Sequence, residues 1–285
     1  MIFIPDADIE RFLLEDIAMG DVTSRSLQLT QQAGHIQFFT RQETVTSGVE
    51  IAKRILLKLG LEVSSAAKEG EILAAGQLIL SGQGQVAALQ QAWKVAQNIL
   101  EWSCGVAQAT ASLLREARSI NPQIQIACTR KSIPGTRLLA TTAVLNGGGI
   151  IHHAGTAETV LVFANHRHFL DQAVDWCTLV ETLRIRAPEK KIVLEADTPA
   201  QAREAMRAQA DIMQLDKFTP EQIMACLRIA EQTQYLGKLI AAGGIHQENV
   251  KEYAATGVPV LVTSSPYYAK PADIKVVLRP INERG

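Results

Sequence analysis

The hydrophobic positions in the first hundred residues predict a small mixed region of helices and strands. From Pro5 to Ala18 the apolar residues recur with helical spacing, which predicts one helix. Residues 34–49 alternate as expected for two strands, and a helix is predicted over residues 49–59. Short apolar pieces separated by glycine turns between residues 61 and 84 indicate further strands of a small antiparallel sheet.

A long helical pattern follows from Val86 to Ile120. The small residues Ser103, Cys104 and Gly105 interrupt it, so two helices meeting at this point are predicted. Lys94 lies in the first of these helices, where a solvated cation is the simplest interpretation.

The pattern then changes to short apolar runs that alternate with helical segments. Buried strands separated by helices are typical of parallel βαβ units. Because the chain has no GxGxxG fingerprint, a barrel is favoured over an open doubly wound sheet. Helices are expected near residues 169–187, 199–208, 219–234 and 246–256. The predicted strands are Ile124–Cys128, Thr159–Phe163, Ile192–Glu195, Ile212–Leu215, Leu239–Ala242 and Val258–Thr263.

Polar residues or glycines follow nearly every one of these predicted strands. In such barrels the chemistry lies at the carboxyl ends of the strands. One polar residue there would be a solvated loop, whereas six convergent positions favour a site. They are Thr129–Lys131, Asn165 with His166, Glu195–Asp197, Asp216 with Lys217, Gly243 with Gly244, and Thr263–Ser265.

The stretch from Thr129 to Gly149 combines cations with a glycine run. Arg130 and Lys131 follow a predicted strand, and Arg137 adds a third cation before a short predicted helix and three consecutive glycines. Cations and close backbone approach suit an anionic, phosphorylated ligand. A solvated turn followed by a flexible loop is the alternative.

The other strand ends supply complementary chemistry. Glu195 and Asp216 end neighbouring predicted strands and could share Mg²⁺, mostly through water. Gly243 and Gly244, before a predicted helix, could cradle a phosphate, and a further loop offers hydroxyl and amide donors through Thr263 and Ser264. The alternative for either carboxylate is a salt bridge with Lys131 or Lys217 at the rim.

Two histidine pairs allow different interpretations. Zinc binding at His166 and His168 is disfavoured because Arg167 lies between them and no thiolate is nearby. His152 is expected to contact a ligand as a donor, while His153 is either a further contact or a plain surface residue.

Composition limits the class of protein. The 285 residues are 47% hydrophobic and 20% charged, with a net charge of −1, which argues against a broad nucleic-acid surface. The four cysteines form no CxxC pair, so four buried thiols in a reducing cytoplasm are expected. No signal peptide and no membrane-length apolar run is recognised, and a cytoplasmic location is predicted.

A set of motifs runs in order along almost the whole chain. The motifs are GDVTS at 20–24, Asn98 with SCGVA at 103–107, TRKSIPGTR at 129–137, GGGIIHH at 147–153, Asn165-His166, LEADT at 194–198, LDKF at 215–218, AGGI at 242–245 and YAATGV at 253–258. Together they resemble the quinolinate phosphoribosyltransferase (nicotinate-nucleotide pyrophosphorylase) family, and TRKxxPGxR with GGG about ten residues later is the most specific signal.

The resemblance implies an N-terminal α/β sandwich domain over residues 1–108, an irregular, incomplete TIM-like α/β barrel over 109–269 and a return of 270–285 to the first domain. It implies a homodimer, or a higher oligomer, with the active site at the interface. The implied reaction joins a nitrogen base to phosphoribosyl pyrophosphate with Mg²⁺ and releases pyrophosphate.

The implied residue roles follow the motifs. Lys131, Glu195 and Asp216 correspond to the catalytic residues for phosphoribosyl pyrophosphate and metal. The implied 5-phosphate site contains Gly243, Gly244, Thr263 and Ser264. The implied substrate contacts also include Arg130, Arg137, His152, His153 and Asn165, and Lys94 stands where the family has an arginine that reaches across the dimer.

Several family cations are replaced here. His153 stands for an arginine, Phe163 and Thr141 stand for lysines, and Ala164 stands for an aspartate. Because a buried carboxylate without its cation costs several kcal/mol, a tight site for the dicarboxylate quinolinate is disfavoured. The pattern is similar instead to the ModD branch, which is associated with molybdate transport genes.

Three functions therefore remain open from the sequence. The first is a phosphoribosyltransferase whose nitrogen-containing acceptor is less anionic than quinolinate. The second is quinolinate phosphoribosyltransferase with an altered pocket. The third is a non-catalytic sensor of a phosphorylated metabolite, or of an oxyanion such as molybdate, that binds through Arg130, Lys131 and Arg137.

Overall fold

The computed structural model describes residues 2–29, 32–170 and 175–281, and its chain divides into two compact units. The first unit comprises Met1–Ala111, Ile133–Gly148 and Pro266–Gly285, and the second comprises Ser112–Ser132 and Gly149–Ser265. The division into domains at 1–108 and 109–269, with 270–285 returning to the first, remains a prediction.

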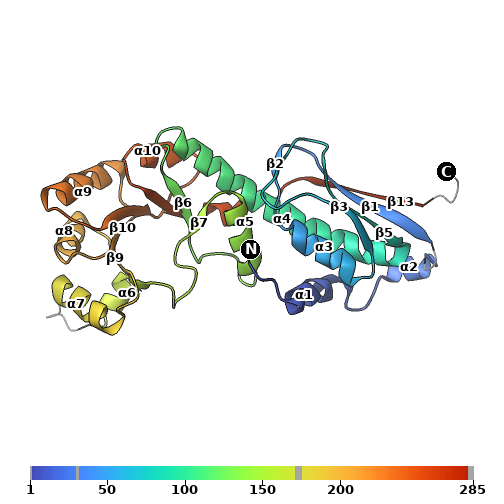
Figure 1. Ribbon diagram of the computed structural model, residues 1–285, viewed down its shortest axis with the longest axis horizontal. Helices are drawn as coiled ribbons and strands as arrows, with labels where there is room; N and C mark the ends of the chain where they lie inside the picture. The colour runs from blue at the N-terminus through green and yellow to red at the C-terminus, as the bar shows by residue number, and fades with distance from the viewer. Residues whose placement is uncertain (1, 30–31, 171–174, 282–285) are drawn as a thin grey trace. The chain divides into compact units, whose positions relative to one another are not determined.

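The first unit is built around an antiparallel sheet of four strands in the order β13-β1-β5-β3 (Figure 1). The sheet comprises β1 (Ala33–Thr40), β3 (Glu62–Ala66), β5 (Leu78–Gln85) and β13 (Ile274–Pro280), and a separate short pair comprises β2 (Thr44–Val45) and β4 (Ile72–Leu73). Its other elements are α1 (Asp6–Ile17), α2 (Val22–Ser26), α3 (Val49–Lys58), α5 (Arg137–Asn146) and the 3-10 turn Ser265–Tyr268 at its edge.

The buried side chains of β1 lie in the core of this unit. Ile36 and Phe38 are fully buried and pack with Ile9 of α1 and Ile55 of α3, while the residues between them on β1 are more exposed. The predicted helices over 5–18 and 49–59 are therefore confirmed within a residue or so at each end.

The long helical region is one continuous helix, α4 (Val86–Arg118), so the prediction of two helices meeting near residues 103–105 was wrong. Gly105 serves packing rather than a break. A Cβ at this position would lie 2.6 Å from the carbonyl oxygen of Lys270. The glycine lets another segment approach the helix, and its helix-breaking tendency of about 1 kcal/mol is overridden by tertiary contacts.

The second unit is a curled parallel sheet of seven strands in the order β7-β6-β12-β11-β10-β9-β8. Helices α7 to α9 cover one side of it (Figure 1). Because β7 and β8 are edge strands, the barrel is incomplete, and the predicted fold class is confirmed. The strands are β6 (Gln125–Cys128), β7 (Ile150–Ile151), β8 (Val160–Val162), β9 (Ile192–Ala196), β10 (Ile212–Asp216), β11 (Lys238–Ala242) and β12 (Val260–Thr263).

The helices of the second unit differ from the predicted ones at their ends. Residues 171–174 of the predicted helix 169–187 lie outside the described residues. The helix expected over 246–256 contains only five residues, because the side chain of Asn249 binds the backbone of His246 and Gly244 and keeps them in a loop. The helices are α6 (Ala164–Arg167), α7 (Trp176–Arg186), α8 (Pro199–Arg207), α9 (Pro220–Gln232) and α10 (Val250–Ala254).

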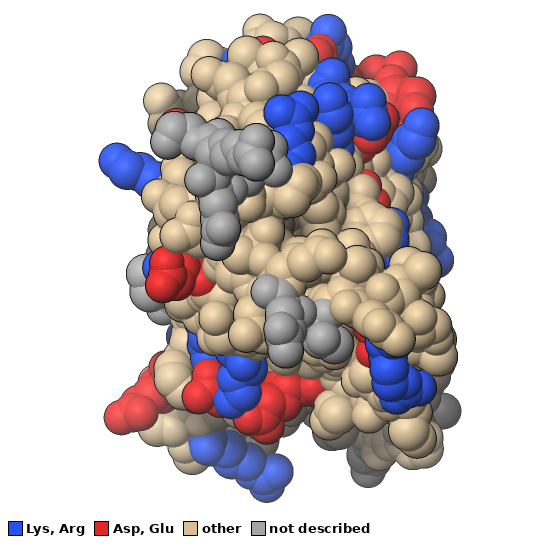
Figure 2. Space-filling model, turned by 90° about the vertical axis from the view of Figure 1, so that its right-hand side faces the viewer, with Lys and Arg blue, Asp and Glu red and all other residues tan. Residues whose placement is uncertain are grey.

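Charged side chains of both signs lie on the surface of the molecule (Figure 2). On the face shown in Figure 2, lysine and arginine side chains lie beside aspartate and glutamate side chains, so this face is not uniformly basic. Among the described residues, no helix is both long and apolar enough to span a membrane.

Cys104, Cys128 and Cys226 are buried, but Cys177 is exposed on α7, so the expectation of four buried thiols was wrong.

The glycine run after α5 includes a tight packing contact that gives a stability test. A Cβ at Gly147 would lie 2.4 Å from the carbonyl oxygen of Ala107 and 2.7 Å from Cβ of Thr110. We expect Gly147→Ala to lower the free energy of unfolding by about 1–3 kcal/mol through overpacking, measured by denaturant titration. Gly155→Ala, whose added methyl group would contact nothing within 4 Å, is the control. Equal stability of the two variants would contradict this packing.

Candidate active site

A pocket of about 410 Å³ opens where the parallel strands of the second unit end. Residues that follow β6, β7, β10, β11 and β12 line it, together with Glu195 within β9. Ten of the thirteen predicted site residues meet there: Arg130, Lys131, His152, His153, Glu195, Asp216, Gly243, Gly244, Thr263 and Ser264.

Three predicted residues do not line this pocket. Lys94 and Arg137 belong to the first unit, on α4 and α5. The Lys94 ammonium lies 4.0 Å from the centre of the Trp93 ring and donates to Gln97 at 3.0 Å. Asn165 is exposed on α6. Their roles remain predictions.

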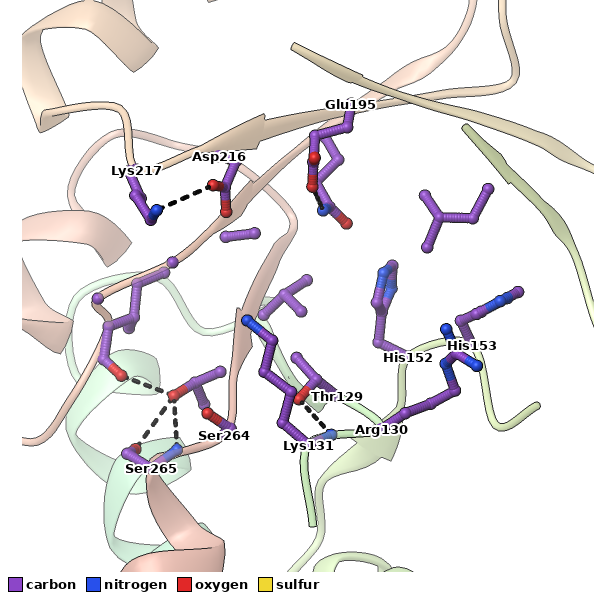
Figure 3. A pocket seen from close by; sticks show the side chains of 18 of the residues that line it. Thr129, Arg130, Lys131, His152, His153, Glu195, Asp216, Lys217, Ser264 and Ser265 are labelled. Carbon is purple, nitrogen blue, oxygen red and sulfur yellow. Dashed lines mark hydrogen bonds and ion pairs between the residues drawn. The ribbon is translucent and has the colours of Figure 1, made fainter. Parts of the chain in front are cut away.

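Two carboxylates form the acidic side of the pocket (Figure 3). Glu195 and Asp216 stand on neighbouring parallel strands, and Glu195 pairs with Gln214, two positions before Asp216. Burial, followed by the charge of Asp216, raises the pKa of Glu195 to about 6. Burial also raises the pKa of Asp216, and the charges of Lys217 and Lys131 oppose that rise. Such repulsion would be relieved by a cation between the carboxylates.

Cations stand opposite and beside the carboxylates. Arg130 and Lys131 occupy the loop after β6, where the Lys131 amide donates to the Thr129 hydroxyl at 3.1 Å. In Figure 3 Lys131 extends from this loop across the pocket from Asp216 and Glu195. The Lys217 ammonium lies 3.9 Å from an Asp216 oxygen, but its side chain is 81% exposed. The rim salt bridge considered from the sequence therefore exists and contributes little stability.

The glycines after β11 adopt backbone conformations that suit a close approach. Gly243 and Gly244 have φ values of +85° and +72°. A Cβ at Gly243 would lie 2.8 Å from an Asp216 oxygen. The expected helix N-terminus is not adjacent, since α10 begins only at Val250. Any anion held here would therefore meet loop amides rather than a helix end.

The serine and threonine loop is internally bonded. The Thr263 hydroxyl donates to the Ile245 carbonyl at 2.6 Å and accepts from the Ser265 amide at 3.0 Å. Thr263 therefore fixes the loop after β12 against the loop after β11. Ser264 lines the pocket beside it.

The histidine side of the pocket combines Arg130 with uncharged and apolar side chains. Burial lowers the pKa of both His152 and His153, with the charge of Arg130 contributing further to the lowering at His153. His153 is only 9% exposed and its Nδ1 lies 2.8 Å from the Thr159 hydroxyl, so the interpretation as a plain surface residue was wrong. Leu161 and Phe163 complete this wall.

Sequence reasoning did not single out three further lining residues. Gln214, His246 and, as a ligand contact, Lys217 also border the pocket. Gln214 is the one polar position within the apolar run Met213–Leu215, and its place before Asp216 on an alternating strand was the available signal.

Comparison with known proteins decides the family. The family model described as quinolinate phosphoribosyl transferase, C-terminal domain, matches residues 106–277, and that of the N-terminal domain matches residues 21–104. The chain belongs to the quinolinate phosphoribosyltransferase family. The resemblance seen in the sequence is thereby confirmed, and with it membership of a family of pentosyltransferases.

The most similar relatives within the family include the ModD proteins. ModD of Escherichia coli O6:H1 is 50% identical over 280 residues, covering 98% of this chain and 99% of that protein. ModD of Pasteurella multocida is 47% identical over 278 residues, covering 98% and 99%. The solved nicotinate-nucleotide pyrophosphorylase of Francisella tularensis aligns with a TM-score of 0.87 and 25% identity, over 97% of this chain and 98% of that one.

The raised pKa of Glu195 gives a pH-dependent stability test. At pH 8 the folded protein holds this carboxylate ionised despite its burial, which lowers the free energy of unfolding. The cost disappears as the pH falls through about 6 to the ordinary value of 4.5. We expect Glu195→Gln to raise the free energy of unfolding by about 1 kcal/mol at pH 8 without divalent metal, and not at pH 4.

Denaturant titrations at the two pH values measure this difference. Glu181→Gln, an exposed position on α7, is the matched control. A stability gain of equal size at both pH values would show that the gain does not come from ionisation of Glu195.

Proposed function

We propose that this protein is a phosphoribosyltransferase of the ModD type. In this proposal it transfers the phosphoribosyl group of phosphoribosyl pyrophosphate to a ring nitrogen of an acceptor less anionic than quinolinate. The observation that carries the proposal is the division of one pocket into two chemically different sides. One side combines carboxylates, a lysine and glycine-rich loops, and the other combines neutral histidines with Leu161 and Phe163.

The charged side suits phosphoribosyl pyrophosphate. Lys131 would bind the pyrophosphate, and the amides of Gly243 and Gly244 with Ser264 would bind the 5-phosphate. As the new bond from the acceptor nitrogen to the ribose carbon forms, the bond from that carbon to pyrophosphate breaks. Glu195, ionised above about pH 6, or Asp216 would stabilise the positive charge that develops on the ribose.

The two carboxylates fit a divalent cation such as Mg²⁺. Both have a raised pKa, and a cation beside them would offset the repulsion between them. Among the described residues no group of three or more histidine, cysteine, aspartate or glutamate side chains could hold a metal, so water and phosphate oxygens would complete the coordination. When bound, Mg²⁺ supplies neutralisation of the pyrophosphate charge.

The histidine side of the pocket disfavours an acceptor with two carboxylates. Arg130 carries a permanent positive charge beside His152 and His153. Burial lowers the pKa of both histidines, so both are uncharged near neutral pH. Phe163, which stands where the resemblance places a family lysine, borders the same side. A second carboxylate of quinolinate would be desolvated there without a matching charge, at a cost of several kcal/mol.

Calorimetric titration of phosphoribosyl pyrophosphate tests the charged side. We expect Mg²⁺-dependent binding that weakens about tenfold or more in Lys131→Ala, because a charge-assisted contact to phosphate is lost. Lys191→Ala is the matched control, since Lys191 is an exposed lysine at the opposite end of β9. Binding of equal strength without Mg²⁺, or unchanged in Lys131→Ala, would contradict the proposal.

A gain-of-function variant tests the acceptor preference of the histidine side of the pocket. Phe163→Lys would place an ammonium beside the acceptor position, so we expect quinolinate to bind about tenfold more tightly to this variant than to the wild type. Leu236→Lys, at a position 91% exposed and outside the pocket, controls for added charge. Tight quinolinate binding by the wild type would favour quinolinate phosphoribosyltransferase itself.

A further inference from the structure

Gln214 is a buried amide in the floor of the pocket. Its neighbours on β10, Met213 and Leu215, pack in the core of the second unit, so alternation along the strand turns Gln214 toward the pocket. Only 4% of its surface is exposed. Its Nε2 donates to an oxygen of Glu195 at 2.6 Å. A polar side chain at this depth has a specific hydrogen-bonding role, because burying it without partners is costly.

The contact with Glu195 fixes which way the amide points. An ionised carboxylate can only accept hydrogen bonds, so the amide nitrogen must face Glu195 and the carbonyl oxygen must face away. That oxygen, Oε1, is buried and has no partner among the residues that the structure describes. A buried acceptor left without a donor destabilises the folded protein, so a donor is expected to face this oxygen.

His152 carries the other unsatisfied atom of the pocket. Its Nε2 is buried without a partner in the described part of the chain, and its ring points toward Glu195 in Figure 3. Burial lowers the pKa of His152, and the nearby Gln214 side chain opposes that lowering, as an amide oxygen that faces the ring would. A neutral imidazole holds one proton, on either nitrogen.

We propose that Gln214 is a positioning residue that holds His152 in the neutral tautomer protonated at Nε2. The Nε2–H donates to Oε1 of Gln214, so one hydrogen bond satisfies both buried atoms. The chain of contacts runs from Glu195 through the amide to His152. The lone pair on Nδ1 is then the part of the ring that is available to a ligand, so His152 accepts a hydrogen bond from that ligand instead of donating one.

This tautomer narrows the class of acceptor. A lone pair attracts an N–H or O–H group and repels a carboxylate, so the pocket selects a neutral nitrogen heterocycle with a donor group beside the reacting nitrogen. This consequence rests on the function proposed above, whereas the tautomer does not.

Nitrogen-15 NMR of the ligand-free protein with labelled histidine tests the tautomer directly. The chemical shifts of the two ring nitrogens distinguish protonation at Nε2 from protonation at Nδ1. The chain has six histidines, and the signal missing from His152→Asn identifies His152. We expect the Nε2–H pattern in the wild type, and its loss to a mixture or to the Nδ1–H form in Gln214→Met, which keeps the length of the side chain and removes the amide.

The control variant is Gln125→Met on β6, a strand of the same sheet whose glutamine lies outside the pocket. It should leave the His152 pattern unchanged. The Nδ1–H pattern in the wild type, or the same pattern in wild type and Gln214→Met, would overturn the proposal. Because the wild-type spectrum alone decides the first outcome, a poorly folded variant does not remove the test. Failure to bind phosphoribosyl pyrophosphate would overturn the proposed function and leave this result intact.

Discussion

The pocket of the second unit depends on two carboxylates that the sheet holds close together. Glu195 and Asp216 can lie side by side because β9 and β10 are adjacent and parallel. Their charges are costly at that depth, and the nearby residues reduce the cost: Gln214 donates to one carboxylate, while Lys131 and Lys217 act on the other. The order of the strands therefore decides that these two charged side chains lie next to each other in the pocket.

The same strand ends separate two kinds of chemistry within one cavity. Strands β9 and β10 bring the two carboxylates, and the loops after β10, β11 and β12 bring Lys217, the paired glycines and Ser264. Segments after β6, β7 and β8 bring Arg130, Lys131, the paired histidines and Phe163. A transferase of the proposed kind needs two such environments near one reacting carbon, since the group transferred is highly charged and the base that receives it need not be.

The sequence predicted the structure best where an element depends mainly on the residues within it. Buried runs such as Ile192–Glu195 predicted strands within a residue or two, and the barrel rule then predicted which residues would meet at the pocket. It was least informative where distant segments decided the outcome. Gly105 indicated a helix break, yet a contact with Lys270 makes it a packing residue. His153 contacts Thr159 and Gln214 donates to Glu195, and periodicity can reveal neither contact.

The strand β13 makes the first unit depend on residues that lie far apart in the sequence. It pairs with β1 along its whole length, Gly34 with Pro280 at one end and Thr40 with Ile274 at the other. During synthesis on a ribosome, β1 emerges before the whole second unit and must wait for residues 274–280 before this edge is paired. Until then β1 presents unpaired backbone groups to other nascent chains. The sheet is therefore completed through a very long closing loop, which favours slow folding.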